Sequence, residues 1–489
     1  MAALVQRLVA SGAAYQTASL VSAGLGALLL PVYTRSLTTG DYGLAETLLT
    51  YLILASIPLR MGLQEAFVRF WFDDEDPERQ RRVAKIASGS VLVTTTIASL
   101  LALAFAGPLS ELLLDERDAT LFGFGVLGLW SFTNLEIAYA MLRVEERRRT
   151  YLIATLINVF LTIALTLVLV VWLDAGARGY VAGNYVASAF VLFGLWWLLR
   201  DRLGFAISGV RPLLRFGGPT IPADMAVFAL NVVDRAYLLQ TQGKAAAGVY
   251  AVSVKLSTAV IVAVRGFQLA WPPLAYSIVD DDEARRFYAR VTTWYVVVVG
   301  SVGAALTLPG QWLVAPLVAP SFREAEEALA WVALGWAGYG LFLVFVVIAG
   351  RAKVTVTQLP AALVGLVINV GLLVLLVDPL GIAGAGIALG ASYLAMMVVL
   401  GLLTRRSFAV PFEWLRLAHA IAVLAGVAVA GELLLPDEGV LGFVLRSLAL
   451  GTIPLALAIT SFTTPDERAM LRALKGGVLG RVSAAIGRS

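Results

Sequence analysis

Hydrophobic residues form long runs along this chain, and short polar segments separate them. Each run has about 20 residues or more, the length that an α-helix needs to cross a bilayer. Fourteen runs are identified, at residues 12–35, 42–71, 84–108, 119–142, 151–173, 179–199, 217–240, 248–277, 291–315, 328–350, 358–377, 381–404, 417–435 and 439–462. Their length, with Gly and Pro inside them, is typical of membrane helices and not of barrel strands. The pattern predicts an all-α polytopic membrane protein with about 14 transmembrane helices.

The composition agrees with this prediction and excludes several functions. Of 489 residues, 59% are hydrophobic and only 14% are charged, whereas about 25% of an ordinary soluble domain is charged. The chain has one His and no Cys, which excludes a disulfide framework, a thiol nucleophile and the usual zinc sites. We therefore expect no metal and no cofactor, and nothing in the sequence indicates a nucleic-acid partner.

The basic residues alternate from loop to loop. If the N-terminus is inside, 26 of the 37 Lys and Arg residues lie in cytoplasmic segments and six lie in outer loops. Because cytoplasmic loops are enriched in Lys and Arg, we expect both termini to be cytoplasmic. No loop is long enough to hold a soluble domain, and no G-x-x-x-x-G-K-[ST] motif indicates a nucleotide-driven pump.

The chain contains two copies of one unit, residues 7–200 and 213–406. In each copy the second span carries an isolated Arg, Arg60 or Arg265, and an acidic-then-basic loop follows it. Six spans separate the copies, so the repeat is parallel and predicts two six-helix lobes around a central cavity. The predicted division is 1–205 and 206–410 for the lobes, 411–462 for two additional transmembrane helices, and 463–489 for a cytoplasmic amphipathic tail.

Three cations inside the spans are candidate binding residues. A charge near the bilayer centre costs about 2.5–3.5 kcal/mol on insertion scales, so it invites a functional interpretation. Arg60, Lys255 and Arg265 have no carboxylate one helical turn away, and a guanidinium suits phosphate recognition. They predict a cavity that binds an anion. The alternative is that carboxylates on neighbouring helices pair with them.

Other isolated charges have two interpretations each. Asp224 and Glu136 are candidates for proton or sodium coupling, or for counter-ions of the arginines. Arg35, Asp234 and Arg235 lie near the outer ends of spans, where they form an outer gate or simply an interface.

Aromatic residues within or near the spans also have two interpretations. They either stack on sugar rings or, more commonly, form belts at the membrane interface. The residues are Tyr15, Tyr33, Trp71, Tyr250, Trp271, Trp336 and Tyr339.

The opening of the chain resembles a known family. The segments are Leu30-Pro31-Val32-Tyr33-Thr34-Arg35-Ser36-Leu37, Asp41-Tyr42-Gly43, Arg60-Met61-Gly62 and Arg69-Phe70. They are similar to those of the bacterial polysaccharide-biosynthesis (O-antigen-type) flippases of the multidrug/oligosaccharidyl-lipid/polysaccharide (MOP) exporter superfamily. Two extra C-terminal helices resemble the arrangement in lipid II flippases.

The resemblance implies a transporter in the bacterial cytoplasmic membrane. It implies alternating access that moves an undecaprenyl-diphosphate-linked oligosaccharide from the inner to the outer leaflet, for cell-surface polysaccharide biosynthesis. The partners it implies are this lipid, the membrane lipid around it and other polysaccharide-assembly proteins. Arg60, Lys255 and Arg265 match the family's cavity cations, whereas span 1 departs because its cation, Arg35, lies at the outer end.

Two rivals remain at the level of sequence. A cation-coupled multidrug exporter of the same superfamily would use an acidic cavity, whereas the isolated charges here lean basic. An enzyme, such as a membrane glycosyltransferase, would need a sizeable outer loop or an acidic motif facing the lipid sugar. The acidic runs at 73–76 and 280–283 lie on the cytoplasmic side beside basic residues, which is typical of solvated charge. The sequence therefore favours a transporter over an enzyme.

Overall fold

The computed structural model describes residues 26, 28–72, 76–206, 209–352, 354–460, 462–464 and 467, and each regular element in these ranges is helical. The all-α prediction is therefore confirmed. Most of the predicted first span lies outside the described residues, which include its helical end at 28–36. The predicted tail helix also lies outside them, apart from residues 463, 464 and 467.

The helices pack into two compact units, and each is described by itself. The first comprises Met1–Tyr276 and Gln311–Phe408, and the second comprises Ser277–Gly310 and Ala409–Ser489. The elements of the first unit are α2 (Thr39–Leu59), α3 (Leu63–Trp71), α4 (Pro77–Ala104), α5 (Ala106–Leu114), α6 (Ala119–Val144), α7 (Arg148–Leu167), the π-turn η1 (Val168–Trp172), α8 (Gly176–Leu198), α9 (Val210–Gly217), η2 (Gly218–Thr220), α10 (Ile221–Leu256), α11 (Thr258–Ser277), α13 (Gly310–Leu317), η3 (Pro320–Phe322), α14 (Ala325–Arg351), η4 (Thr355–Thr357) and α15 (Gln358–Arg405). The division of the chain at 205, 410 and 462 stays a prediction.

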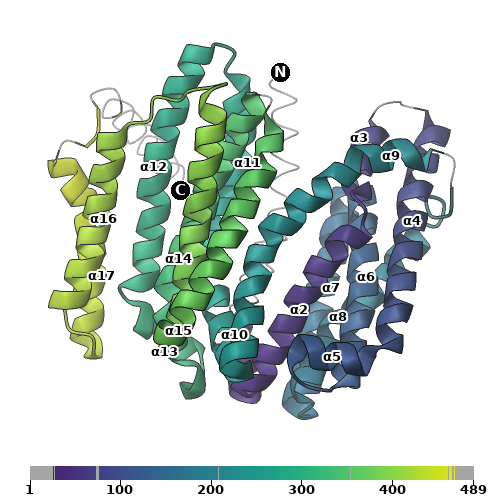
Figure 1. The fold of residues 1–489 in the computed structure, drawn as a ribbon. Helices are drawn as coiled ribbons and strands as arrows, with labels where there is room; N and C mark the ends of the chain where they lie inside the picture. The colour runs from purple at the N-terminus through teal and green to yellow at the C-terminus, as the bar shows by residue number, and fades with distance from the viewer. Residues whose placement is uncertain are drawn as a thin grey trace, which may run out of the picture. The chain divides into compact units, whose positions relative to one another are not determined.

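Within the first unit, the helices form two groups. Helices α2, α4, α6, α7 and α8 pack on one another, as do α10, α14 and α15, and α2 packs along α10 between the two groups (Figure 1). The core of the first group is apolar and centres on α3, α4, α6 and α8, with Phe67, Ile86, Leu142 and Leu192 buried in it. The first group lies within residues 1–205 and the second within 206–410, whereas α12 (Asp281–Thr307), also within 206–410, belongs to the second unit.

Eleven described helices are long and apolar enough to cross a membrane. Two of these stretches are twice the usual length, Val210–Leu256 and Gln358–Arg405. Each is interrupted by one glycine with positive φ, Gly243 (φ 85°) and Gly381 (φ 54°), a conformation that glycine adopts without steric cost. In Gln358–Arg405 the turn joins two spans, as the hydrophobic pattern predicts, and in Val210–Leu256 it joins one span to the start of the next.

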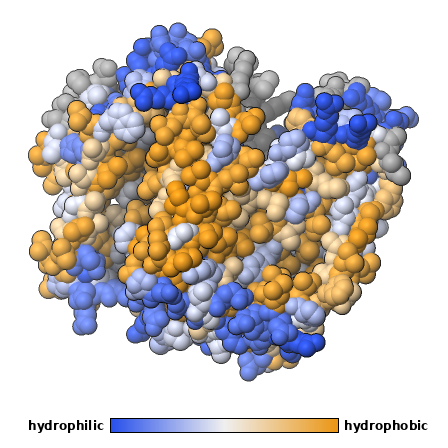
Figure 2. Space-filling view, in the orientation of Figure 1, coloured by the Kyte–Doolittle hydropathy of each residue, from blue (hydrophilic) through white to orange (hydrophobic). Residues whose placement is uncertain are grey.

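The surface of the first unit reflects the apolar sequence. Hydrophobic side chains cover α14 and α15 in a continuous band (Figure 2), and α15 exposes Val367, Val374, Leu375 and Leu402. Exposed aliphatic side chains on long helices are expected where the surrounding solvent is lipid.

The predicted second span, 42–71, is not one helix. Helix α2 ends at Leu59, and α3 begins at Leu63 after Met61 and Gly62, both with positive φ. A Cβ at Gly62 would lie 2.1 Å from the carbonyl oxygen of Gly217, so the turn allows the two backbones to approach closely. Arg60 therefore lies at the C-terminal end of α2. The sequence had suggested a position in the middle of one long span.

The predicted eighth span is also divided. Helix α10 ends at Leu256, and the Ser257 hydroxyl donates to the Ser253 carbonyl at 2.8 Å before α11 begins at Thr258. Such a side-chain bond competes with the helical ladder. Lys255 and Arg265, expected on one helix, thus belong to consecutive helices.

The second unit contains α12 (Asp281–Thr307), α16 (Trp414–Leu434) and α17 (Gly439–Ile459). Its core contains Val297, Ala420 and Leu457. Buried Arg446 on α17 donates to Glu432 at 2.8 Å and to the Leu308 carbonyl at 3.3 Å. The arginine thereby ties the ends of the three helices together.

Candidate functional site

A cavity of about 790 Å³ lies within the first unit, lined by residues of α2, α3, α10, α11, α14 and α15. Its volume falls in the 300–1,000 Å³ range of small-molecule sites. Helix α2 comes from the first helix group and α10, α14 and α15 come from the second, so the wall is shared between the two lobes. This position agrees with the central cavity that a parallel repeat predicts.

Two of the three predicted anion-binding cations, Arg60 and Arg265, line the cavity. Arg60 donates from Nη1 to the Gln64 side-chain oxygen at 2.8 Å and from Nε to the Ser56 carbonyl at 3.3 Å. Arg265 is exposed to the cavity, and among the described residues no carboxylate or other acceptor contacts its guanidinium. Neither arginine forms an ion pair within the described part of the chain. Both therefore retain donors for a bound anion.

Carboxylates line the same cavity, so its charge is mixed. The acidic and basic residues in the lining are Glu46, Arg60, Glu65, Asp224, Asp234, Arg235 and Arg265. Asp224 lies in the first turn of α10, where a negative charge interacts favourably with the helix dipole. Glu136, the other predicted coupling residue, lies on α6 and is not in the lining.

Lys255 pairs with a carboxylate on a neighbouring helix, which is the alternative that the sequence left open. Its Nζ lies 2.6 Å from Glu46 Oε1 and 3.1 Å from the Tyr180 hydroxyl oxygen, and Tyr180 donates to the same Glu46 oxygen at 2.8 Å. Lys255 is not among the residues that line the cavity. The pairing offsets the cost of placing each charge in an apolar environment.

Arg235 also contacts Glu46, from the second helix group to the first. Its Nη1 donates to the Thr50 hydroxyl and, at 3.2 Å, to the Glu46 carbonyl, and it lies 3.6 Å from Glu46 Oε2. We define Glu46, Tyr180, Arg235 and Lys255 as the ion-pair cluster. It joins α2 and α8 to α10.

The sequence reasoning missed Glu46, the central residue of the ion-pair cluster. The signal was available, because Glu46 is an isolated carboxylate inside a predicted span, and such residues mark functional or pairing sites. Glu46 is 7% exposed. A cation partner on another helix was therefore required.

The other two predicted gate residues have separate partners. Asp234 is 1% exposed and accepts a hydrogen bond from the Tyr250 hydroxyl at 3.0 Å. Both residues belong to α10, so this bond does not cross between the helix groups. Arg35 donates to the Pro316 carbonyl at 3.2 Å, which links residues 28–36 to the end of α13. Their gating role stays a prediction.

Glycines allow α2 and α10 to touch next to the ion-pair cluster. A Cβ at Gly43 would lie 2.0 Å from the Lys244 carbonyl oxygen, and one at Gly248 would lie 2.0 Å from the Thr39 carbonyl oxygen. Backbone contact this close needs residues without a Cβ. The charge pattern assigns these ends of the helices to the outside, so in this structure the two lobes are in contact at the predicted outer end.

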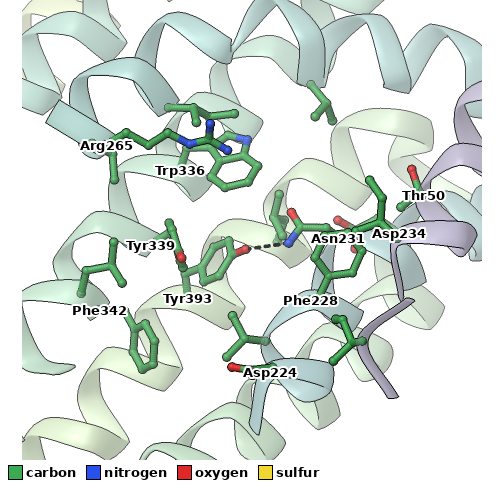
Figure 3. Close-up of a pocket in the computed structure, with 18 of the residues that line it drawn as sticks. Thr50, Asp224, Phe228, Asn231, Asp234, Arg265, Trp336, Tyr339, Phe342 and Tyr393 are labelled. Atoms are coloured by element: carbon green, nitrogen blue, oxygen red, sulfur yellow. Dashed lines mark hydrogen bonds between the residues drawn. The ribbon is translucent and has the colours of Figure 1, made fainter. Parts of the chain in front are cut away.

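Aromatic side chains of α14 and α15 form one side of the cavity (Figure 3). Trp336 and Tyr339 meet edge to face with ring centroids 5.7 Å apart, and Tyr393 lies 5.2 Å from Tyr339. Phe342 stacks on Tyr339 at 6.5 Å. We call Trp336, Tyr339, Phe342 and Tyr393 the aromatic wall. Trp336 and Tyr339, weighed above as interfacial residues, thus face a cavity.

Comparisons with known proteins address the fold and the family. The lipid II flippase MurJ in an inward closed conformation matches with a TM-score of 0.73 at 13% identity, covering 93% of this chain and 99% of that chain. An inward-facing multidrug resistance MATE family transporter of the MOP superfamily matches with a TM-score of 0.67 at 16% identity, covering 81% and 94%. A MOP superfamily transporter from Pyrococcus furiosus matches with a TM-score of 0.58 at 13% identity, covering 82% and 94%. At these identities the matches show a shared fold.

No curated protein sequence matches the chain. A family model described as polysaccharide biosynthesis protein matches residues 8–275, which is more than half of the 489 residues. The match includes the first helix group, Arg60, the ion-pair cluster and Arg265. The chain is therefore a multi-helix membrane protein with the fold of MOP superfamily transporters, and it belongs to the polysaccharide biosynthesis protein family.

Proposed function

We propose that this protein flips an undecaprenyl-diphosphate-linked oligosaccharide from the inner to the outer leaflet of the bacterial cytoplasmic membrane. The observation that carries the proposal is a cavity shared between two helix groups, lined by Arg60 at the end of α2 and by the unpaired Arg265 of α11. The family description and the likeness to a lipid II flippase support it. Both termini are proposed to be cytoplasmic.

The chemistry of such a substrate explains why a cavity is needed. A diphosphate and its sugars cannot enter hydrocarbon without losing hydration that nothing there replaces. Guanidinium groups bind phosphate oxygens bidentately and remain charged. Arg60 and Arg265 would hold the diphosphate, while the prenyl chain stays in lipid. Membrane lipid and polysaccharide-assembly proteins are the remaining proposed partners.

Alternating access would use the contact between α2 and α10. The ion-pair cluster joins these helices in the present state, and its opening would expose the cavity to the outer side. Under this proposal Lys255 acts at the gate through Glu46, and Arg235 acts with it. Asp234 and Arg35 remain proposed contributors to the same outer end.

A cation-coupled multidrug exporter is the second candidate, favoured by the carboxylates in the lining. Glu65 and Asp224 line the cavity, and among the described residues neither forms an ion pair. They offer a site for a cationic drug or for a coupling proton or sodium ion. Glu136 stays a candidate for ion coupling away from the cavity.

Reconstitution separates the two candidates. Liposomes would hold the wild type, Arg265→Ala or the control Arg143→Ala, an arginine outside the lining. Appearance of a fluorescent polyprenyl-diphosphate saccharide in the opposite leaflet is expected for the wild type and the control and is expected to be lost in Arg265→Ala. Transport of a cationic dye in its place, lost on Asp224→Asn, would overturn the flippase proposal in favour of the exporter.

A further inference from the structure

The aromatic wall carries no formal charge, yet it forms one side of the cavity. Trp336, Tyr339 and Phe342 are spaced by three residues on α14, which places them on one face of the helix. Tyr393 packs behind them from α15, with its ring centroid 6.3 Å from that of Trp336. All four belong to the second helix group, whereas Arg60 belongs to the first.

The wall is rigid and partly accessible. Tyr393 is fully buried, and its hydroxyl accepts a hydrogen bond from the Asn231 amide at 3.3 Å. Edge-to-face and stacked contacts hold Trp336 and Tyr339 in place, and both stay partly exposed. Aromatic faces held in this way present a large apolar area at low entropic cost.

Polar groups line the same cavity as this apolar face. Asn231, Gln268 and Gln358 line the cavity together with the wall, and Figure 3 shows Arg265 on the Trp336 side. A saccharide has the matching chemistry, because each ring has an apolar face of C–H groups and a rim of hydroxyls. An organic cation also stacks on aromatic rings, but at Trp336 it would meet the positive charge of Arg265.

We infer that the aromatic wall is a saccharide-binding subsite that stacks on a sugar ring of the lipid-linked substrate next to the anion held by Arg265. The inference rests on the proposed function and adds to it the place where the sugar is recognised. Since the wall and Arg60 lie in different helix groups, a substrate that occupies both would bridge the lobes. The sugar, and not only the diphosphate, would then select the substrate.

Binding measurements on the full chain in lipid nanodiscs test the subsite. The probes are farnesyl diphosphate and a farnesyl diphosphate that carries a disaccharide. The wild type is expected to bind the saccharide-bearing probe about tenfold more tightly, which corresponds to about 1.4 kcal/mol. Trp336→Leu is expected to abolish this difference without weakening the binding of farnesyl diphosphate.

Two further variants make the test specific. Trp331→Leu alters a tryptophan of the same helix that is 41% exposed and outside the lining, and this variant is expected to bind both probes as the wild type does. Tyr339→Ala removes another aromatic ring of the wall and serves as the test variant if Trp336→Leu does not fold. Arg265→Gln is expected to weaken the binding of both probes, because both carry the diphosphate.

The outcomes distinguish the subsite from the proposed function. If the wild type binds both probes equally, or if Trp336→Leu and Tyr339→Ala weaken both probes equally, the saccharide subsite is overturned and the flippase proposal survives. If the wild type binds neither probe but binds tetraphenylphosphonium in a Trp336-dependent way, both are overturned and the wall is a cation site.

Discussion

At the scale of single residues, the charges inside the spans serve two purposes that sequence alone did not separate. The charge of Lys255 is balanced by Glu46, with 2.6 Å between Nζ and Oε1, whereas the guanidinium of Arg265 has no acceptor among the described residues. Both are isolated cations in the sequence. Only the position of the partner helix distinguishes a charge that holds lobes together from one that is available to a ligand.

Glu46→Gln is expected to open the predicted outer end, because the ion-pair cluster loses the charge that attracts Arg235 and Lys255. Breaking a buried ion pair from one side costs about 3–5 kcal/mol, which is enough to shift a two-state equilibrium. The chain has no native Cys, so a single Leu49→Cys in the cavity lining reports access. Its labelling by an impermeant maleimide from outside should rise several-fold. Glu111→Gln on α5 is the control, and unchanged labelling in Glu46→Gln would count against a gate.

Asp118 is the N-cap residue of α6. Its carboxylate accepts from the backbone N–H groups of Thr120 and Leu121 and from Arg178 Nε at 2.8 Å. Partial burial alone would raise its pKa, but these hydrogen bonds and the Arg178 charge together lower the pKa below its ordinary value. Because the pKa is lower in the folded state, the ionised Asp118 stabilises the fold at pH values above the ordinary pKa of a carboxyl group. This stabilisation is lost as the pH falls through the folded-state pKa.

Asp118→Ala is accordingly expected to cost about 1 kcal/mol at neutral pH, the usual value of an N-cap. Thermal unfolding in detergent, measured for wild type and variant at neutral and acidic pH, checks this. The difference in unfolding temperature between the wild type and Asp118→Ala should become smaller at acidic pH. A difference that stays constant would rule out the ionised carboxylate as its source.

At the scale of elements, glycines determine how closely helices approach and where they break. Gly62 and Gly217 meet at the turn after α2, and Gly43 and Gly248 meet where α2 touches α10. The sequence marks these residues as helix breakers or small residues, but it does not indicate which helix passes over them. The division of span 42–71 is unpredictable for the same reason, since Gly217 lies more than 150 residues away.

Gly43→Val is expected to separate α2 from α10, because its Cβ would lie 2.0 Å from the Lys244 carbonyl oxygen and 2.7 Å from the Gly248 nitrogen. Outside labelling of the Leu49→Cys reporter should therefore increase, as in Glu46→Gln. Gly266→Val is the matched control, since a Cβ at Gly266 would have no neighbouring atom within 4 Å among the described residues. Equal labelling of the two variants would contradict the role assigned to this glycine contact.

At the scale of the whole molecule, the alternation of basic and non-basic loops predicts one orientation in the membrane. Two cysteine variants report this orientation. Asp174, before α8, is in a predicted outer loop, and Glu146, before α7, is in a predicted inner loop. In intact cells an impermeant maleimide is expected to label Asp174→Cys and to reach Glu146→Cys only after permeabilisation. The reverse pattern would overturn the proposed direction of transport.

The sequence by itself determined the helical class, the presence of bilayer-length spans and the repeat between the two halves, but not the breaks that divide 42–71 and 248–277. The class, the spans and the repeat follow from local hydrophobicity and from the length of helix that a bilayer requires. It also identified Arg60 and Arg265, since isolated cations in apolar runs stand out. The tertiary structure alone decided the pairing of Lys255 with Glu46 and the place of Trp336 and Tyr339 beside a cavity. Their neighbours come from helices distant in sequence, and hydropathy carries no information on which helix face meets which.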